Sequence, residues 1–524
     1  MDIPQSPPVA PLNPQSENYF PVVIVGAGPT GLTLANLLGI YGVPFLVIER
    51  NASVAMEPRA VSIDDESLRT LQTVGLVDQV LRHVVQGYGT WYYSWSGRQF
   101  AKIVPTLKDY GYNKRNAFRQ RLLVEQLRDG LARFKDSTIW FEHSLTAFSE
   151  SDRKLTLELA AKGSKKTISC DWLVACDGGR SEIREKLGIK LGGSTYSAKW
   201  LIVDLVGRTH PLRHTKTFCN PWRPAVRLPG PEGTLRYEFM LHKGEAGVVD
   251  ADEEFARDCI RKFEPLDADL KIVRQVTYGF HARIADKWRI GRVFLAGDAA
   301  HLTPPFAGQG MNSGVRDATN LGWKLAAVYH NRLPETLLES YEKERLPHAW
   351  NLIKMAIQIG RFMQPSSLAD AIFAQSVLKF LCLVKPAREY ILQLKFKPKP
   401  RFKTGFFQTD TNKQALMPPG QLFPQPLIEI PGGERVLLDF ALGEGFSVLK
   451  LKTSKKMDIT IFPDLSNIEI NEIQVVPAEE DFISADTTDL VIRDCEQVIE
   501  KILLGANAKA VVLRPDRYIY GYIA

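Results

Sequence analysis

The sequence lacks the patterns that mark several common classes of protein. Its six cysteines include no Cys-x-x-Cys pair, and neither they nor the nine histidines have the spacing of zinc ligands. We therefore predict no metal site and no disulfide framework, and we expect free thiols in a reducing cytoplasm. No apolar run reaches the roughly 18 residues that span a bilayer, and the first residues do not form a signal-peptide pattern. The most apolar helix candidate, over residues 371–384, is expected to be a core-facing amphipathic helix.

Blocks of like charge are also missing. The net charge is +7, yet no stretch is basic enough to predict an arm that binds nucleic acid. A mildly basic surface suits an enzyme that takes anionic cofactors and acidic substrates. The hydrophobic fraction of 45% and the charged fraction of 24% are those of a soluble globular protein, and the length predicts about two to four domains.

The stretch from Arg292 to Asn312 carries the strongest local pattern. An apolar run over Val293–Ala296 predicts a buried strand, and Gly297 and Asp298 follow it directly. A Pro-Pro pair then excludes helix, and a helix is predicted from Gly310. Such a helix start offers free N–H groups and a partial positive charge to an anion. Alone, the stretch also fits an ordinary strand–loop–helix crossover.

The first ordered segment contains a Gly-x-Gly-x-x-Gly motif formed by Gly26, Gly28 and Gly31. A predicted strand over Pro21–Val25 leads into it, a helix follows, and the next predicted strand ends at Glu49. The first glycine permits a tight turn, the second lets the backbone approach a pyrophosphate, and the third allows close helix–strand packing. Because an acid at the end of the second strand binds ribose hydroxyls, the pattern predicts a dinucleotide site.

Three further segments place polar residues at turns. Arg59 precedes a predicted helix over Glu66–Val74 that Asp64 or Asp65 caps, and its guanidinium either reaches a phosphate or lies at the surface. Gln120 lies at the start of another predicted helix. A buried strand over Trp172–Cys176 ends in Asp177 and Gly178, which repeats the strand–acid–glycine pattern seen around Asp298.

In combination these motifs resemble the class A FAD-dependent aromatic hydroxylases. The resemblance covers about Phe20 to Pro347 and is carried by the first glycine motif with its acid, by Asp177-Gly178, and by Gly297-Asp298 with the Pro-Pro…Gly-Gln-Gly-Met-Asn loop. Within the family, the segments around Arg59 and from Cys219 onward look most like the 3-(3-hydroxyphenyl)propionate hydroxylase branch.

The resemblance implies an FAD cofactor held by residues of these motifs. It implies that the glycines hold the pyrophosphate, that Asp298 holds the ribityl chain, and that the helix start presents N–H groups to the pyrimidine end of the flavin. Arg121 departs from the family, which commonly has proline there. The implied cofactor-binding residues are Gly26, Gly28, Gly31, Glu49, Arg50, Arg59, Gln120, Asp177, Gly178, Gly297, Asp298, Gly310, Met311 and Asn312.

The resemblance also implies the reaction. NADH or NADPH reduces the flavin, dioxygen adds to give a flavin hydroperoxide, and the ring of a phenolic substrate attacks the distal oxygen, ortho to its hydroxyl. The pocket has to exclude water, and the cofactor carries the difficult chemistry. Two alternatives remain open, namely epoxidation or polyketide hydroxylation on the same fold, and a flavin-binding protein without hydroxylase activity.

Substrate contacts are expected from the segment that roofs the pocket. Arg223, Arg227 and Arg236 are candidate anchors for a carboxylate, although each also fits a solvated sheet edge. Pro304 is expected to line the pocket. His281 is expected either to aid phenol deprotonation or to serve the structure, and no general base is identified.

These expectations define an α/β protein with a Rossmann-like FAD-binding domain, an inserted antiparallel-sheet substrate domain and a C-terminal thioredoxin-like domain without a redox Cys-x-x-Cys. The C-terminal domain is expected to pack against the rest of the chain or to join copies in a homo-oligomer. Its short strands are predicted over Arg435–Asp439, Phe446–Leu451, Asp458–Phe462, Asp489–Val491 and Ala510–Leu513. The predicted division is a disordered Pro-rich tail (1–19), the FAD-binding domain (20–190 and 280–395, with sheet elements around 85–118), the substrate domain (191–279) and the C-terminal domain (396–524).

Overall fold

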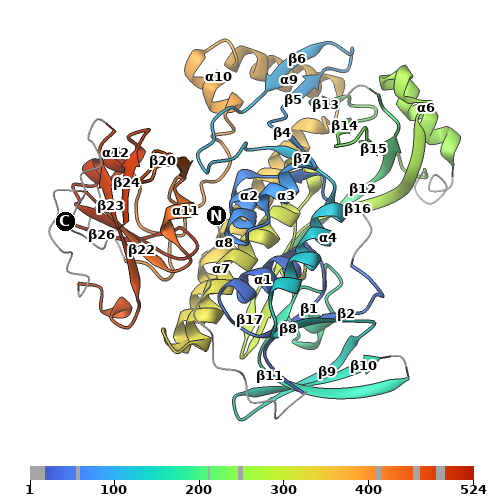
Figure 1. Cartoon of the computed structure of the whole chain (residues 1–524). Helices are drawn as coiled ribbons and strands as arrows, with labels where there is room; N and C mark the ends of the chain where they lie inside the picture. Colours follow the sequence, from blue (N-terminus) through green and yellow to red (C-terminus); the bar gives the residue numbers. More distant parts are fainter. Residues whose placement is uncertain are drawn as a thin grey trace.

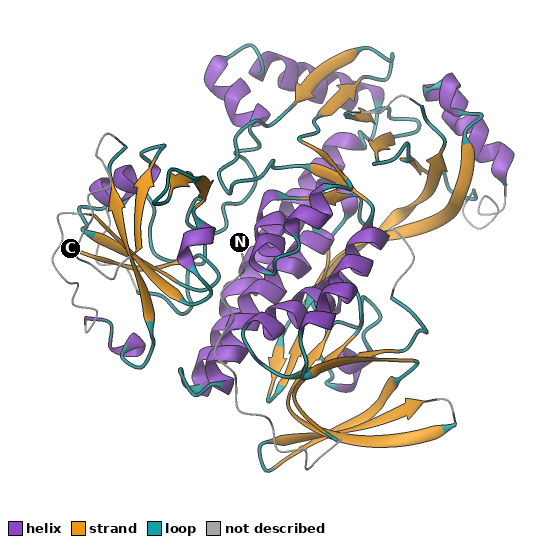
Figure 2. Ribbon diagram, viewed as in Figure 1, coloured by secondary structure: helices purple, strands orange, loops and turns teal. Residues whose placement is uncertain are grey.

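The protein is described by a computed structural model (Figure 1). It describes residues 18–54, 59–161, 163–209, 213–245, 252–408, 415–451, 461–478 and 490–524. Almost all of the predicted Pro-rich tail lies outside these residues, and Tyr19 already belongs to the first strand. Figure 2 shows long helices at the centre of the view, with sheets on several sides of them.

The first sheet has a parallel core of five strands, to which an antiparallel edge strand and a hairpin are added. Its strands β1, β2, β8, β11 and β18 all run parallel. Helix α1 and strand β9 pack against β2, which is buried along its whole length. In spatial order the strands are β17 (Arg289–Ile290), β18 (Val293–Leu295), β11 (Ser164–Ala175), β1 (Tyr19–Val25), β2 (Phe45–Glu49) and β8 (Ser137–Phe141), with β10 (Lys154–Ala161) and β9 (Ser144–Ser151) continuing from β11.

The second sheet is mostly antiparallel. Its outer face packs on α6, because alternate residues of β15 (Leu235, Tyr237 and Phe239) join the buried cluster that includes Ala256 and Ile260 of that helix. The other residues of β15 therefore point to the opposite face. In spatial order the strands are β19 (His301–Leu302), β16 (Lys271–Ala285), β12 (Leu191–Val206), β15 (Leu235–Met240), β14 (Ala225–Pro229), β13 (Thr215–Phe218), β5 (Thr90–Tyr93) and β6 (Gln99–Ile103).

Two smaller features complete the strand order. Three short strands form a separate sheet, β3 (Ser62–Ile63), β7 (Asn116–Phe118) and β4 (Val84–Gln86). The C-terminal sheet has the order β21 (Arg435–Leu437), β20 (Leu427–Glu429), β24 (Leu490–Asp494), β23 (Ile470–Val476), β22 (Phe446–Leu451), β25 (Ala510–Leu513) and β26 (Ile519–Ile523). It lies beside α7 and α8 in Figure 1, and Trp323 of α7 packs on its Phe446.

The helices form the layers between these sheets. The glycine-motif helix α1 packs on both α7 and α4. The helices are α1 (Pro29–Ile40), α2 (Asp65–Thr73), α3 (Val77–Leu81), α4 (Gln120–Gly130), α5 (Glu182–Lys186), α6 (Glu253–Phe263), α7 (Gly310–Tyr329), α8 (Glu339–Met363), α9 (Leu368–Leu381), α10 (Lys385–Leu392), α11 (Asp439–Leu442) and α12 (Val498–Gly505).

Several local predictions are confirmed. The strand–glycine–helix order at the start is β1 and α1, and the strand before Asp298 is β18. Asp64 is the N-cap of α2, because its side chain accepts a hydrogen bond from the Ser67 N–H. A C-terminal strand predicted over Asp458–Phe462 falls largely outside the described residues, and Phe462 itself is not in a strand.

Two predictions about the arrangement differ from the structure. Strands β5 and β6, which were expected near the FAD-binding domain, are hydrogen-bonded into the second sheet through β13. The predicted boundary at 279–280 also falls inside the continuous strand β16. Both differences arise because strand pairing joins segments far apart in the chain, which local patterns do not record.

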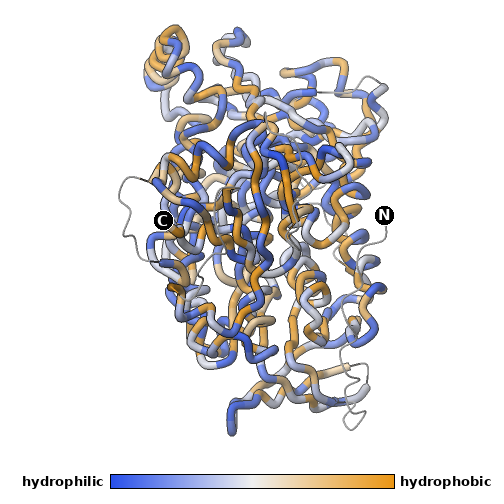
Figure 3. The backbone as a smooth tube through the Cα atoms, turned by 60° about the vertical axis from the view of Figure 1, so that its left-hand side comes forward, coloured by the Kyte–Doolittle hydropathy of each residue, from blue (hydrophilic) through white to orange (hydrophobic). Residues whose placement is uncertain are grey.

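The prediction that residues 371–384 form a core-facing helix is wrong about its packing. In α9 only Ala371 and Gln375 are buried, and Phe373 is 71% exposed. Among the described residues, no helix is both long enough and apolar enough to cross a membrane. Consistent with this, Figure 3 shows hydrophobic residues in many short stretches that alternate with hydrophilic ones.

A buried group of charges ties α2, α7 and the segment after α10 together. The Arg316 Nε donates to Glu66 Oε2 at 2.6 Å, and the same guanidinium bonds Asp64. Lys397 Nζ adds bonds to Glu66 at 2.7 Å and to Asp64 at 3.1 Å. Burial alone raises the pKa of Glu66, but Arg316 and Lys397 hold it well below its ordinary value. Asp64, Asp65 and Glu66 lie close enough together to resemble a metal site. Two of these carboxylates, Asp64 and Glu66, are already paired with Arg316 and Lys397.

We predict that Arg316→Ala strongly destabilises the protein, because it leaves two buried carboxylates with one cation. Breaking a buried ion pair costs about 3–5 kcal/mol. The matched control is Lys343→Ala, which removes an exposed i,i+4 pair with Glu339 on α8 and is expected to cost at most about 0.5 kcal/mol. Urea titration of both variants checks this, and equal stabilities would contradict it.

Candidate functional site

One large cavity lies between the first and second sheets. Its volume of about 1740 Å³ exceeds the range of about 300–1,000 Å³ that is usual for a single small ligand. One end is lined by the turns that follow β1, β2, β11 and β18, and the other by the inner face of the second sheet. The cavity therefore has room for a cofactor and a substrate together.

The glycine motif forms the end wall of this cavity. Gly26 has φ +111°, and a Cβ there would lie 2.3 Å from the Cys176 carbonyl oxygen; a Cβ on Gly31 would lie 2.1 Å from the Gly26 oxygen. A Cβ on Gly28 would meet no atom within 4 Å, and Gly28 lines the cavity. Gly26 and Gly31 therefore serve close packing, whereas Gly28 leaves its space to a ligand.

Glu49 is fixed beside this turn. Its Oε2 accepts a hydrogen bond from the Ala27 N–H at 2.9 Å, and its Oε1 accepts bonds from Asn51 N–H and Nδ2. Glu49 and Arg50 both line the cavity at the end of β2. This is the position at which an acid reaches the ribose of a dinucleotide.

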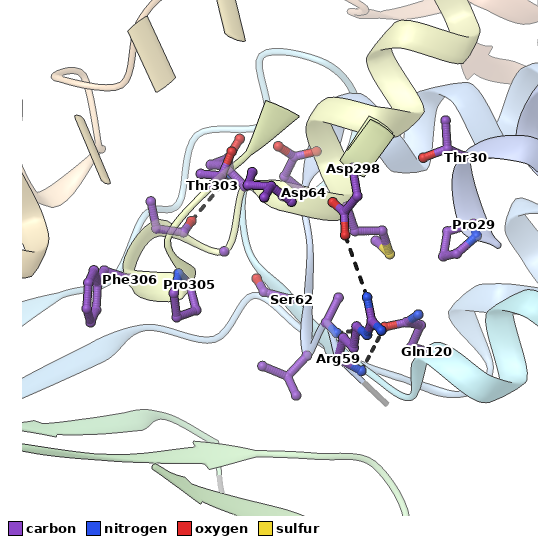
Figure 4. A pocket seen from close by; sticks show the side chains of 18 of the residues that line it. Pro29, Thr30, Arg59, Ser62, Asp64, Gln120, Asp298, Thr303, Pro305 and Phe306 are labelled. Atoms are coloured by element: carbon purple, nitrogen blue, oxygen red, sulfur yellow. Dashed lines mark hydrogen bonds and ion pairs between the residues drawn. The ribbon is translucent and has the colours of Figure 1, made fainter. Parts of the chain in front are cut away.

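Arg59, Gln120 and Asp298 meet along one side of the cavity (Figure 4). Gln120 Oε1 accepts bonds from the backbone N–H groups of Arg59, at 2.9 Å, and Ala60, at 2.6 Å. The Arg59 guanidinium lies 3.8 Å from Asp298 Oδ2 and remains 63% exposed. Gln120 thus orients the backbone that carries Arg59, and both charged side chains are available to a ligand.

Asp177, at the end of β11, has one carboxylate oxygen that is free to bind a ligand in the cavity. Its Oδ2 accepts a bond from Ile183 N–H at 3.4 Å, but its Oδ1 is buried without a partner. Burial raises the pKa of this carboxyl. Because unpaired buried acceptors are rare, Asp177 and the neighbouring Gly178 fit a ligand that carries hydroxyl donors, such as the sugar parts of FAD.

The start of α7 forms a further wall. Pro305–Ala307 is a short 3-10 helix, Gly308 follows with φ +63°, and α7 begins at Gly310. Gly310 and Met311 line the cavity. Asn312 does not: its side chain is buried and bonds Asp64 N–H and Ser67 Oγ, which fixes the helix start from behind.

Two other predicted positions also lie behind the wall. Gly297 is buried with φ +60°, and a Cβ there would lie 2.5 Å from Thr30 Oγ1, so it serves packing. The prediction that Pro304 lines the cavity is wrong, because Pro304 is buried and its neighbours Thr303 and Pro305 form the lining. Phe306 of the same loop packs on Trp200 and Phe280 of the second sheet.

The predicted substrate arginines have other partners. Arg223 is not among the residues that line the cavity; it bonds Glu245 at 2.7 and 3.0 Å, so its proposed role as an anchor is wrong. Arg227 is buried against Asp267, also away from the lining. Arg236 does line the cavity, but Asp204 binds it through two bonds of 2.6 and 3.0 Å.

His281 lies where it was expected, on the cavity wall. Its Nδ1 is 3.0 Å from Thr195 Oγ1. Burial and the nearby Arg283 lower the pKa of the imidazole, which keeps it neutral near pH 7. The geometry therefore allows a hydrogen bond to a ligand but assigns no proton transfer to it.

Sequence reasoning missed Arg115. It lines the cavity, stacks at 4.5 Å over the Tyr88 ring and donates to the hydroxyls of Thr90 and Tyr88. Among the ion pairs of the described residues it has no carboxylate partner, in contrast to Arg223 and Arg236. No local pattern marks it, because its partners Thr90 and Tyr88 lie 25 and 27 residues earlier in the chain.

Comparisons with known proteins agree with this site. The model of the FAD binding domain family matches residues 19–356, and that of the HcaD C-terminal domain matches residues 420–524. A 3-(3-hydroxy-phenyl)propionate/3-hydroxycinnamic acid hydroxylase of Klebsiella pneumoniae subsp. pneumoniae is 36% identical over 97% of this chain and 92% of its own length.

Solved structures show the same fold. The flavin-dependent monooxygenase PieE, in complex with FAD and substrate, has a TM-score of 0.78 at 21% identity and 96% coverage of both chains. The p-nitrophenol 4-monooxygenase PnpA from Pseudomonas putida DLL-E4 has a TM-score of 0.67 at 25% identity, over 72% of this chain and 98% of PnpA. The family model covers more than half of the chain, and the curated relative is matched along almost its whole length. The chain therefore belongs to the FAD binding domain family and is an FAD-dependent monooxygenase of the aromatic hydroxylase type.

Proposed function

We propose that this protein hydroxylates a phenolic substrate that carries a carboxylate, ortho to the existing hydroxyl, with NADH or NADPH and dioxygen as co-substrates. The observation that carries this proposal is Arg115, a half-buried cation on the cavity wall whose hydrogen-bond partners are neutral hydroxyls. A guanidinium in that setting favours a carboxylate ligand, because an unpaired charge away from water is costly. The curated relative named above acts on acids of this kind.

The proposed cofactor arrangement follows the cavity from one end to the other. Gly28 leaves room for the pyrophosphate, Glu49 receives the ribose, and Asp177 and Asp298 accept hydroxyl hydrogens along the chain of the cofactor. When bound, FAD would supply the redox chemistry, namely acceptance of a hydride and activation of dioxygen, as the family resemblance implies. The start of α7 at Gly310 faces the same cavity and stabilises negative charge there through its free N–H groups.

The second sheet and the proline loop are proposed to keep water away from the reacting atoms. Phe306 joins Trp200, Phe280 and Tyr196 in an aromatic cluster beside the cavity. Met355, Ile359 and Met363 of α8 continue this apolar wall. A dry cavity strengthens the electrostatic contacts and suppresses side reactions of activated oxygen.

We also propose the division into domains given above, with β5 and β6 reassigned to the substrate-binding part. The C-terminal sheet combines parallel and antiparallel strands, which supports a thioredoxin-like domain. Its role is proposed to be packing against α7 or joining copies of the chain.

The proposed reaction is tested with a panel of phenolic acids. We expect 3-(3-hydroxyphenyl)propionate or a close analogue to stimulate NADH or NADPH consumption and to give a product heavier by one oxygen atom. Arg115→Gln should raise the KM of the acid by about tenfold or more, since a charge-assisted hydrogen bond is worth about 1.5–3 kcal/mol. The KM of a neutral 3-alkylphenol should stay unchanged.

The matched control for that variant is Arg223→Gln, because Arg223 lies away from the cavity. It should leave both KM values at the wild-type level. If Arg115→Gln behaves like Arg223→Gln, the carboxylate does not bind at Arg115. If no phenolic acid stimulates turnover, the proposed substrate class is wrong.

A second prediction concerns the cofactor. Gly28 has an extended backbone, with φ −84° and ψ −179°, and open space around its missing Cβ. Gly28→Asp should therefore fold normally but place an anion where the pyrophosphate lies, and purified protein should contain no FAD. Gly31→Ala is the contrast, because its Cβ would meet the Gly26 backbone and should disturb folding. A Gly28→Asp protein with one FAD per chain would overturn this placement.

A third prediction concerns the proline loop. Replacing Pro304 and Pro305 by glycine widens the conformations of the loop without removing a cofactor-binding side chain. We expect near-normal FAD content, but more hydrogen peroxide and less product per NADH consumed. The control is Pro334→Gly, because Pro334 also precedes a 3-10 helix with a similar backbone but does not line the cavity. Unchanged coupling in the double variant would show that the loop does not shape the pocket.

A further inference from the structure

The inner face of the second sheet presents one acidic side chain to the cavity from β15. Glu238 lies opposite Ile202 of β12 and Val226 of β14, and all three line the cavity. The two neighbours are apolar, so the carboxyl group projects from an apolar strip of sheet. The alternating residues Tyr237 and Phe239 are buried on the other face against α6.

The Glu238 carboxylate makes no hydrogen bond or ion pair within the described part of the chain. Glu238 is half-buried, and carboxylates that are partly withdrawn from water are usually paired with cations or N–H groups. Two other acids of the cavity wall do have partners: Glu49 accepts three hydrogen bonds and Asp177 accepts one. Glu238 therefore keeps its full acceptor capacity for a ligand.

None of the charged or titratable groups around Glu238 forms a hydrogen bond or an ion pair with its carboxylate in the described part of the chain. Arg236, two residues earlier on the same face, is bound by Asp204 of β12. Arg274 of β16 lies 3.3 Å from the same Asp204 and bonds the Tyr278 hydroxyl. Across the sheet on β5, Tyr92 also lines the cavity. No charged residue of α8 is among those that line the cavity.

We propose that Glu238 is the proton acceptor for the phenolic hydroxyl of the substrate, and thus a catalytic residue of the hydroxylation. The proposal rests on the function proposed above. In this step the O–H bond of the phenol breaks, its electron pair stays on the phenolic oxygen, and the proton moves to a Glu238 carboxylate oxygen. The resulting phenolate has an electron-rich ring at the ortho carbon, which is what attack on activated oxygen requires.

The electrostatic setting of Glu238 supports this role. Burial raises the pKa of its carboxyl to about 7, with Arg236 opposing and Asp204 adding to the shift. A phenol has a pKa of about 10, so the raised pKa of Glu238 lies closer to that of the donor than the pKa of an ordinary glutamate does. An acceptor with a pKa near the working pH is also the most effective general base.

The sheet places this acceptor opposite the proposed carboxylate anchor. Arg115 is held by Thr90 of β5, and β13 and β14 lie between β5 and β15. At about 4.8 Å between neighbouring strands, the two backbones are about 14 Å apart, and both side chains line the space between them. An aromatic acid bound there would place its carboxylate at Arg115 and its hydroxyl at Glu238, since the reverse orientation sets two carboxylates together.

The test uses the FAD-loaded enzyme and 3-(3-hydroxyphenyl)propionate. Glu238→Gln keeps the size of the side chain but removes its ability to accept a proton. We expect kcat to fall at least tenfold at pH 7 and to recover as the pH approaches the pKa of the free phenol. The pH profile of kcat should show a limb with a pKa near 7 in wild type, which reports the ionised Glu238 carboxylate, and this limb should be absent from the variant. Glu238→Asp should restore part of the low-pH activity.

Controls separate this inference from the proposed function. Glu232→Gln, on a surface loop where Glu232 contacts His83 and Arg119, should keep the wild-type pH profile. Hydroxylation with an unchanged profile in Glu238→Gln would overturn the role of Glu238 alone, whereas no hydroxylation of any phenolic acid by wild type would overturn the proposed function. Should the variant not fold, the wild-type pH profile decides: a limb of kcat with a pKa near 7 supports the role, and a profile that rises only with the ionisation of the free phenol rejects it.

Discussion

The site depends on a close contact between backbones at the first turn. Gly26 lies against the Cys176 carbonyl at the end of β11, and Gly31 lies against Gly26, so α1 sits directly on the ends of two parallel strands. On the other side of α1, Gly314 of α7 leaves room for Thr30, where a Cβ would come within 2.2 Å of its hydroxyl. These contacts bring the starts of α1 and α7 to one cavity and set the turns that follow β1 and β18 relative to them.

The cofactor end of the site could be predicted because its residues are close in sequence to the elements that hold them. Glycine turns, a strand-terminal acid and a helix start are local patterns, and Gly28, Glu49, Asp177 and Asp298 all line the cavity as expected. The exceptions are small displacements: Asn312, Gly297 and Pro304 lie one layer behind the wall, because sequence spacing does not tell which residue of a turn faces inward.

The substrate end could not be predicted in the same way. Arg223 and Arg236 were both predicted to anchor a carboxylate, yet only Arg236 lines the cavity. Both form ion pairs with acids, Glu245 and Asp204, that lie 22 and 32 residues away in the chain. Arg115 is held by hydroxyl groups that lie 25 and 27 residues earlier in the chain. Glu238 faces the cavity because β15 pairs with β12 and β14, and local patterns record neither arrangement. The exposure of α9 was not predicted for a related reason. An apolar, periodic helix sequence indicates that one face should be buried, but it does not show whether another element packs against that face.

The strand order of the second sheet affects how recombination between related genes could change the substrate pocket. Its strands come from separate parts of the chain, with β5 and β6 preceding β8 and β11 of the first sheet, and β19 following β18. No single continuous segment contains the wall of the substrate pocket. Recombination would therefore need two or more crossovers to replace the whole wall, and the new strands would have to pair with the old ones. A point substitution at an inward-facing position leaves the hydrogen bonds between the strands intact. The fold therefore favours a change of substrate range by successive point substitutions over the exchange of one substrate-binding segment.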